Sequence, residues 1–133
     1  LEEIEMEQKQ KVWIYCHTSV PDDRKGLLKS QQRQLLLYAR QMDAQVIGSS
    51  GDMGQQDFES RSGFRFFLAQ ARKSQVQALY ILNSESVADT GQQWEKFVDM
   101  MKRMNMQVFS PRVGCMIGLQ DEGMKEQAVL CLQ

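Results

Sequence analysis

The sequence has few of the residues that build disulfide frameworks, metal sites and membrane spans. It contains three cysteines, which lie far apart, and a single histidine, His17. Without a Cys-x-x-Cys pair, these residues support neither a disulfide framework nor a structural zinc site. No window approaches the roughly 18 apolar residues of a membrane span, and the acidic start is unlike a signal peptide. We therefore expect a cytoplasmic protein with no membrane partner.

The chain also lacks a strong excess of either charge. Its 16 Lys and Arg residues and 17 Asp and Glu residues give a net charge of -1. This balance offers no global electrostatic argument for nucleic acid or an anionic membrane as partner. A local basic excess begins just after Ser19, where Asp22 and Asp23 alone oppose Arg24, Lys25, Lys29, Arg33 and Arg40.

Length and composition indicate one globular domain. A chain of 133 residues with 42% hydrophobic content can bury a single core. Residues 1–10, rich in Glu and Gln, predict a flexible lead-in, and residues 11–120 predict the folded domain. The chain ends on the apolar residues Ala128, Val129, Leu130 and Leu132. We expect 121–133 to begin a C-terminal helix that continues in a longer protein.

Apolar residues follow strand and helix periods in alternation. Strands are predicted at 11–16, 44–49, 78–82 and 107–110, with 113–118 open between a strand and a turn. Helices are predicted at 28–42, 64–73 and 90–106. The first helix should pack on the sheet through Leu35, Ala39 and Met42. The third should begin with a capping box of Thr90 and Gln93.

Strands that alternate with helices indicate right-handed βαβ units. The predicted fold is α/β, with three layers: a mostly parallel sheet of four to five strands and helices on both faces. Ligands bind such sheets beyond the carboxyl ends of the strands. The loops at those ends are 17–25, 50–62 and 83–89. Ser19, Arg61 and the segment at Asn83 are therefore expected to converge.

Several chemistries fit these residues poorly. The run Gly51-Asp52-Met53-Gly54 is neither a dinucleotide fingerprint nor a Walker loop. Cys16 and His17 are consecutive on a strand, so their side chains point to opposite faces and cannot share a proton. A serine hydrolase at Ser19 would need a separate histidine base and a Gly-x-Ser-x-Gly elbow, which are lacking.

Structural roles compete with catalytic ones at each candidate position. Ser19 could cap the turn before the first helix, and Arg61 could be a solvated turn residue. Asp52 and Gln31 are residue types that often cap helices or loops. Cys16 is expected to be buried packing. The apolar stripe from Trp94 to Met104 is expected to be core.

Four segments, in order and with fitting spacing, resemble the catalytic domain of serine site-specific recombinases, the resolvase and invertase family. The first, Tyr15-Cys16-His17-Thr18-Ser19, resembles the family's Tyr-x-Arg-x-Ser. The others are Leu28-x-x-Gln31 with Leu35 and Tyr38-Ala39, Asp52-x-Gly54 with Arg61-x-Gly63-Phe64, and the strand Leu79-Tyr80-Ile81-Leu82-Asn83. The resemblance covers about residues 12 to 110.

This resemblance implies a resolvase-like domain that cleaves and rejoins DNA through a 5′-phosphoserine intermediate, without metal or other cofactor. It makes Ser19 the nucleophile position, Arg61 a phosphate-binding position, and Gln31 and Asp52 supporting polar positions. It implies double-stranded DNA as partner, bound also through segments beyond Gln133, and self-association to a dimer or tetramer. Resolution, inversion and integration of DNA all remain open.

The sequence departs from the family at its expected cations. His17 stands where the family has arginine and could carry part of that charge. Asn83, Ser84 and Val87 stand where it has Asp, Arg and Arg. One transition-state arginine contributes about 10³- to 10⁵-fold in phosphoryl transfer. Three hypotheses follow: recombination that is weakened or lost, an inactive dimerisation or regulatory module on DNA, and an unrelated flavodoxin-like ligand-binding domain.

Overall fold

A computed structural model describes residues 8–21 and 25–119 of the chain. The predicted lead-in over 1–10 lies mostly outside these residues. The predicted C-terminal helix over 121–133 lies wholly outside them. No helix within the described ranges is long and apolar enough to cross a membrane.

A mixed sheet forms the centre of the fold. Among the described residues it has five strands in the order β2-β1-β3-β4-β5. The strands are β1 (Lys11–Thr18), β2 (Gln45–Met53), β3 (Ala78–Tyr80), β4 (Gln107–Ser110) and β5 (Gly114–Ile117). Strands β1 to β4 run parallel, and β5 is antiparallel to β4. The segment 113–118 thus contributes a strand rather than only a turn.

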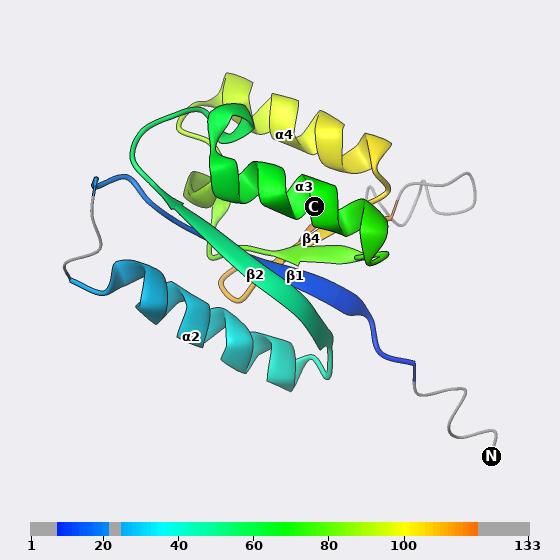
Figure 1. The fold of residues 1–133 in the computed structure, drawn as a ribbon. Coiled ribbons are helices and arrows are strands. Elements are labelled where there is room, and N and C mark those ends of the chain that lie inside the picture. Colours follow the sequence, from blue (N-terminus) through cyan, green and yellow to red (C-terminus); the bar gives the residue numbers. More distant parts are fainter. Residues whose placement is uncertain (1–7, 22–24, 120–133) are drawn as a thin grey trace, which may run out of the picture.

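Helices cover both faces of this sheet (Figure 1). Helix α2 (Leu27–Gln41) lies on one face, and α3 (Ser62–Lys73) and α4 (Gly91–Arg103) lie on the other. Two short 3₁₀ turns, η1 (Phe58–Ser60) and η2 (Ser84–Ser86), precede α3 and α4. The predicted three-layer, mostly parallel α/β fold is confirmed.

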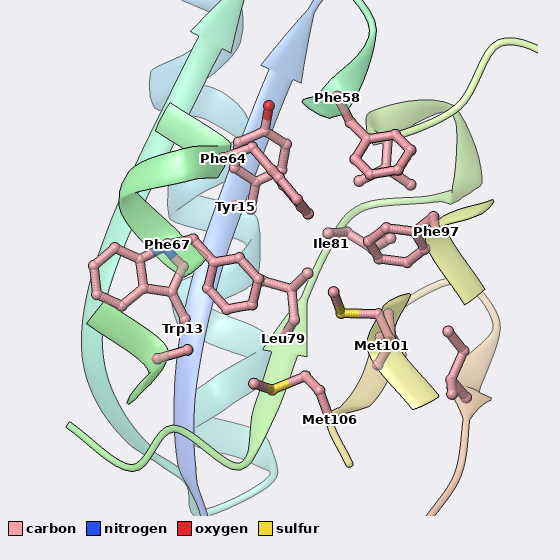
Figure 2. Close-up of a cluster of buried hydrophobic side chains, with 14 of the residues drawn as sticks. Trp13, Tyr15, Phe58, Phe64, Phe67, Leu79, Ile81, Phe97, Met101 and Met106 are labelled. Atoms are coloured by element: carbon pink, nitrogen blue, oxygen red, sulfur yellow. The ribbon is translucent and has the colours of Figure 1, made fainter. Parts of the chain in front are cut away.

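Strand β1 is buried on both faces, as its nearly unbroken apolar run predicts. On the α2 side, the core contains Val12, Ile14, Cys16, Leu35, Ala39, Ala78 and Tyr80. On the other side, Trp13 and Tyr15 pack among Phe64, Phe67 and Phe97 (Figure 2). Burial raises the pKa of the Cys16 thiol to about 12, so this cysteine is a neutral packing group.

The parallel pairing of β1 and β2 makes both strands longer than the sequence predicted. Their register continues to the pair Thr18 and Met53. The polar loop expected over 50–60 therefore begins only at Gly54, and Asp52 lies on a strand. Strand β3, in contrast, ends at Tyr80 rather than at residue 82.

The three predicted helices are present, with differences in detail. Helix α4 ends at Arg103 rather than at residue 106. Thr90 Oγ1 accepts a hydrogen bond from the Gln93 backbone N–H at 3.1 Å, which is one half of the predicted capping box. The reciprocal bond is not formed, because Gln93 Oε1 is buried without a partner among the described residues. Phe97 of α4 is fully buried. Met42, however, does not pack on the sheet but is 45% exposed. It caps the end of α2, where the backbone turns at Asp43 with φ 54°, and so leaves the buried face of the helix.

Candidate functional site

The carboxyl ends of β1 and β3 border a polar pocket of about 310 Å³. It is lined by residues of β1, the start of α2 and the segment that contains η2. They are His17, Thr18, Ser19, Gln31, Leu82, Asn83, Glu85, Ser86 and Asp89. Ser19 and the Asn83 segment therefore converge, as the crevice rule predicts.

Ser19 is exposed at the edge of this pocket, directly after the last residue of β1. Its neighbour Thr18 is fixed because the Thr18 carbonyl accepts a hydrogen bond from the Gly54 N–H at 2.9 Å. Within the described residues, no hydrogen bond engages the Ser19 hydroxyl. Helix α2 begins after Gly26, which has φ 67°, and has no side-chain cap. Ser19 therefore does not cap α2 itself, and part of the turn that it was expected to cap, 22–24, lies outside the described residues.

Gln31 binds the backbone at the end of β1, two residues before Ser19. Its Nε2 donates to the His17 carbonyl at 2.7 Å, and its Oε1 accepts from the His17 N–H at 3.0 Å. The β1–β3 pairing ends at Ile14 and Tyr80, so strand pairing with β3 does not reach His17. The Gln31 amide replaces the missing strand there and ties α2 to the end of β1.

The His17 side chain is also tied down. Its Nε2 lies 2.8 Å from the Gly54 carbonyl, which can only accept, so Nε2 carries the proton. Burial lowers the pKa of His17, and the nearby Arg61 charge lowers it further. The Gly54 hydrogen bond and the carboxylates of Asp52 and Asp89 oppose this shift. At neutral pH His17 is therefore an uncharged hydrogen-bond donor, not a replacement cation.

Asp52 caps helix α3 from the neighbouring strand. Its two carboxylate oxygens accept from the N–H groups of Gly63 at 2.7 Å and Phe64 at 2.9 Å. Negative charge at this end of the helix is also favoured by the helix dipole. A Cβ on Gly63 would lie 2.5 Å from the Gly51 carbonyl oxygen and 2.7 Å from Asp52 Oδ2. Only glycine allows the helix to approach the strand this closely.

Arg61 is 3% exposed, so it is not a solvated turn residue. Its Nε donates to the Gln56 carbonyl at 2.8 Å, and its Nη1 donates to the Ser86 carbonyl at 2.9 Å. The same Nη1 lies 3.4 Å from the Tyr15 hydroxyl. Arg61 thus joins the loop before η1 to the η2 segment. It does not line the pocket that contains Ser19.

Tyr15 lies between Arg61 and Asp52. Its hydroxyl donates to Asp52 Oδ2 at 2.7 Å, and its side chain is fully buried. Burial raises the pKa of Tyr15, with the Arg61 hydrogen bond acting in the opposite direction. The phenol therefore stays protonated and connects two buried charged groups.

No protein-family profile and no curated protein sequence matches the chain. Solved structures share its architecture. The N-terminal catalytic domain of TP901-1 integrase has a TM-score of 0.69 and 16% identity, over 92% of this chain and 91% of that one. The C-terminal catalytic domain of ISC1926 TnpA, an IS607-like serine recombinase, has a TM-score of 0.66 and 17% identity, over 90% of this chain and 77% of the other.

A resolvase family site-specific recombinase from Streptococcus pneumoniae also matches, with a TM-score of 0.64 and 17% identity over 92% of this chain and 83% of that one. The chain has the fold of serine recombinase catalytic domains. The resemblance stated from the sequence motifs is confirmed at the level of the fold.

Within this recombinase fold, the charges around Ser19 are acidic. Glu85 and Asp89 are exposed and line its pocket, whereas no described Lys or Arg lines it. Val87, at a position where the family resemblance puts arginine, is 1% exposed and belongs to the core beneath α3 and α4. The pocket as described offers a phosphate two carboxylates and no arginine.

The predicted site residues divide into two groups. His17, Ser19 and Gln31 line the pocket, while Asp52 and Arg61 form a buried cluster with Tyr15. No group of three or more His, Cys, Asp or Glu residues in the described ranges could hold a metal ion.

Sequence reasoning missed Tyr15 as the centre of that cluster and Ser86 as the acceptor for Arg61. Tyr15 had a signal: on strand β1 it shares a face with His17, two positions along, and both precede Ser19. Ser86 acts through its backbone carbonyl, so its side-chain type carried no signal.

Proposed function

We propose that this chain is a recombination-related domain of a DNA-acting protein in which cleavage through Ser19 is lost or strongly weakened. One observation carries the proposal: the pocket around Ser19 contains Glu85 and Asp89 and no described Lys or Arg. A DNA phosphate placed beside Ser19 would meet the like charges of Glu85 and Asp89 before any cation of the described residues.

The electrostatics of phosphoryl transfer explain why this matters. Arginines that hold the developing charge contribute about 10³- to 10⁵-fold each, or about 4 to 7 kcal/mol, and their losses do not add simply. Arg61 is the predicted arginine that survives, and its Nε and Nη1 are engaged by two backbone carbonyls and a phenol. His17 is neutral near pH 7 because burial lowers its pKa.

A domain of this kind would act in dimerisation or regulation rather than in strand transfer. A chain with the recombinase fold can occupy the place of a recombinase subunit beside DNA without cutting it. The proposed partners are double-stranded DNA and further copies of the chain, forming a dimer or tetramer in the cytoplasm. No cofactor enters this proposal.

Active strand transfer is a second candidate, favoured by the exposure of Ser19 and its unengaged hydroxyl. In this reaction the Ser19 oxygen attacks a backbone phosphorus and forms the phosphoserine bond. The bond from phosphorus to the 3′ oxygen breaks, and that oxygen leaves as a 3′ hydroxyl. Rejoining reverses these steps. Arg24 and Lys25 follow Ser19 closely in sequence and are the cations that could serve this candidate.

The experiment is a trapping assay with the full-length protein and a nicked suicide substrate that carries its cognate site. We expect no covalent protein–DNA adduct, and the same cellular phenotype for Ser19→Ala and the wild type. Ser60→Ala is the matched control, because Ser60 is also exposed and lies outside the pocket. An adduct that forms with the wild type and with Ser60→Ala, but not with Ser19→Ala, would establish the second candidate instead.

A further inference from the structure

Helix α2 carries a stripe of basic residues on the side that faces away from the sheet. Lys29, Arg33, Leu36 and Arg40 recur at intervals of four, three and four residues, which places them on one side of the helix. All are exposed. The buried side of α2 is formed by Leu35 and Ala39 instead. Figure 1 shows no described element over the outer side of α2.

No ion pair within the described part of the chain neutralises these cations. Helix α2 contains three basic residues and no acidic one. None of Lys29, Arg33 and Arg40 forms an ion pair with another described residue. The whole chain has a net charge of -1, so the remainder outside this +3 helix carries -4. The net positive charge of α2 thus contrasts with the net negative charge of the rest of the chain, although α3 also has three basic residues and no acidic one.

We propose that the outer side of α2 binds the phosphate backbone of double-stranded DNA through Lys29, Arg33 and Arg40. The inference rests on the proposed function for its partner, but it places the contact on a surface separate from the Ser19 pocket. Eleven residues of helix separate Lys29 from Arg40, a length of about 16 Å. One DNA strand presents a phosphate about every 3.4 Å of helix axis, so the stripe spans about five phosphates.

The composition of this surface favours a polyanion over a membrane. Interfacial helices insert a broad apolar side into the lipid. In α2 that broad side is already buried against β1, and the outer side has Leu36 and Leu37 among Ser, Gln and basic residues. The exposed leucines of α2 are Leu27, Leu36 and Leu37, which form no broad apolar side for lipid insertion, whereas three arginine or lysine side chains suit phosphate oxygens.

Salt-dependent binding of the full-length protein to a DNA duplex tests the inference. Each phosphate contact contributes about 0.9 to the slope of log affinity against log salt. The triple variant Lys29→Gln, Arg33→Gln and Arg40→Gln should lose about 2.7 from that slope. Between 50 and 200 mM salt, the wild type should therefore weaken about 40-fold more than the variant.

A second triple variant on the opposite face provides the control. It combines Arg72→Gln, Lys73→Gln and Lys102→Gln on α3 and α4, and changes the net charge by the same amount. The slope of log affinity against log salt should change by less than about 0.9, the contribution of one phosphate contact. Glutamine forms helices about as well as lysine or arginine, so all variants should fold. Circular dichroism checks this.

The outcomes separate this inference from the proposed function. The inference is supported if the salt dependence of DNA affinity decreases in the α2 variant and not in the control variant. Equal slopes in the α2 variant and the wild type overturn it, while DNA binding itself leaves the proposed function standing. A wild-type protein that binds no duplex even at low salt overturns both. If the α2 variant loses binding to phosphatidylserine vesicles but binds DNA like the wild type, the inference is overturned in favour of a membrane contact.

Discussion

The Tyr15 hydroxyl lies 2.7 Å from Asp52 Oδ2, and neither side chain is more than 8% exposed. This single hydrogen bond connects β1 to the carboxylate that caps α3. Because Arg61 Nη1 approaches the same hydroxyl, Tyr15 also fixes the arginine that joins the loops at the carboxyl edge. The predicted supporting residue and the predicted phosphate-binding residue therefore depend on a tyrosine between them.

Removing this hydroxyl should destabilise the protein. We expect Tyr15→Phe to lower the free energy of unfolding by about 1 to 3 kcal/mol, because a buried carboxylate loses a donor. Tyr80→Phe is the matched control, since the Tyr80 hydroxyl is buried without a partner in the described structure. Its removal should be neutral or slightly stabilising. Urea unfolding of both variants checks this, and equal losses would contradict it.

The close approach of Gly63 to β2 predicts a large effect from one methyl group. Gly63→Ala should destabilise the protein by about 3 kcal/mol, because the new Cβ meets the Gly51 carbonyl and the Asp52 carboxylate. Gly91→Ala, at the start of α4, meets nothing within 4 Å and should stabilise by about 0.5 kcal/mol. Thermal unfolding gives both values. A Gly63→Ala protein as stable as the wild type would refute the contact.

The contribution of the two hydrogen bonds between Gln31 and the His17 backbone can be measured in two ways. Gln31→Ala should cost about 1 to 2 kcal/mol and speed hydrogen exchange of the His17 amide, which loses its acceptor. Gln34→Ala removes an exposed glutamine from the same helix, with one 3.4 Å contact to Ser30 Oγ, and should change stability by less than about 0.5 kcal/mol. Unchanged protection at His17 in Gln31→Ala would count against this role.

Stability should fall below pH 6.5 because of His17. Its pKa is lowered in the folded state, so between that value and about 6.5 the unfolded chain binds more protons than the folded one. Stability is therefore fully present above pH 6.5 and decreases as the pH falls through this window. His17 is the chain's one histidine, so its NMR titration is unambiguous. His17→Gln should flatten stability between pH 5.5 and 7, and a slope that persists there would exclude His17 as the cause.

Much of the fold followed from local patterns in the sequence. The apolar run of β1 and the helical stripe around Phe97 predicted that these segments are buried, and Thr90 with Gln93 predicted a helix start. The errors came from tertiary pairing. The residues from Ser50 to Asp52 are small or polar, so their side chains predict a loop. They form a strand because their backbone pairs with that of β1.

The candidate site was less predictable than the fold. The crevice rule correctly brought Ser19 to the Asn83 segment. It could not indicate that Arg61 points into the protein, because its direction depends on the backbone carbonyls of Gln56 and Ser86. Every residue has a backbone carbonyl, so residue type does not indicate which carbonyl accepts a hydrogen bond. The sequence therefore predicted that Ser19 lies near the Asn83 segment, but not that Arg61 and Asp52 lie outside their pocket.

The burial of Val87 limits which residues can stand at this position. An arginine introduced there would bring a charge into the core beside Ile81 and Phe97, and an unpaired buried charge is far more destabilising than a surface change. Val87→Arg alone should therefore strongly destabilise the protein. An arginine at position 87 could be accommodated only together with further changes in the surrounding core.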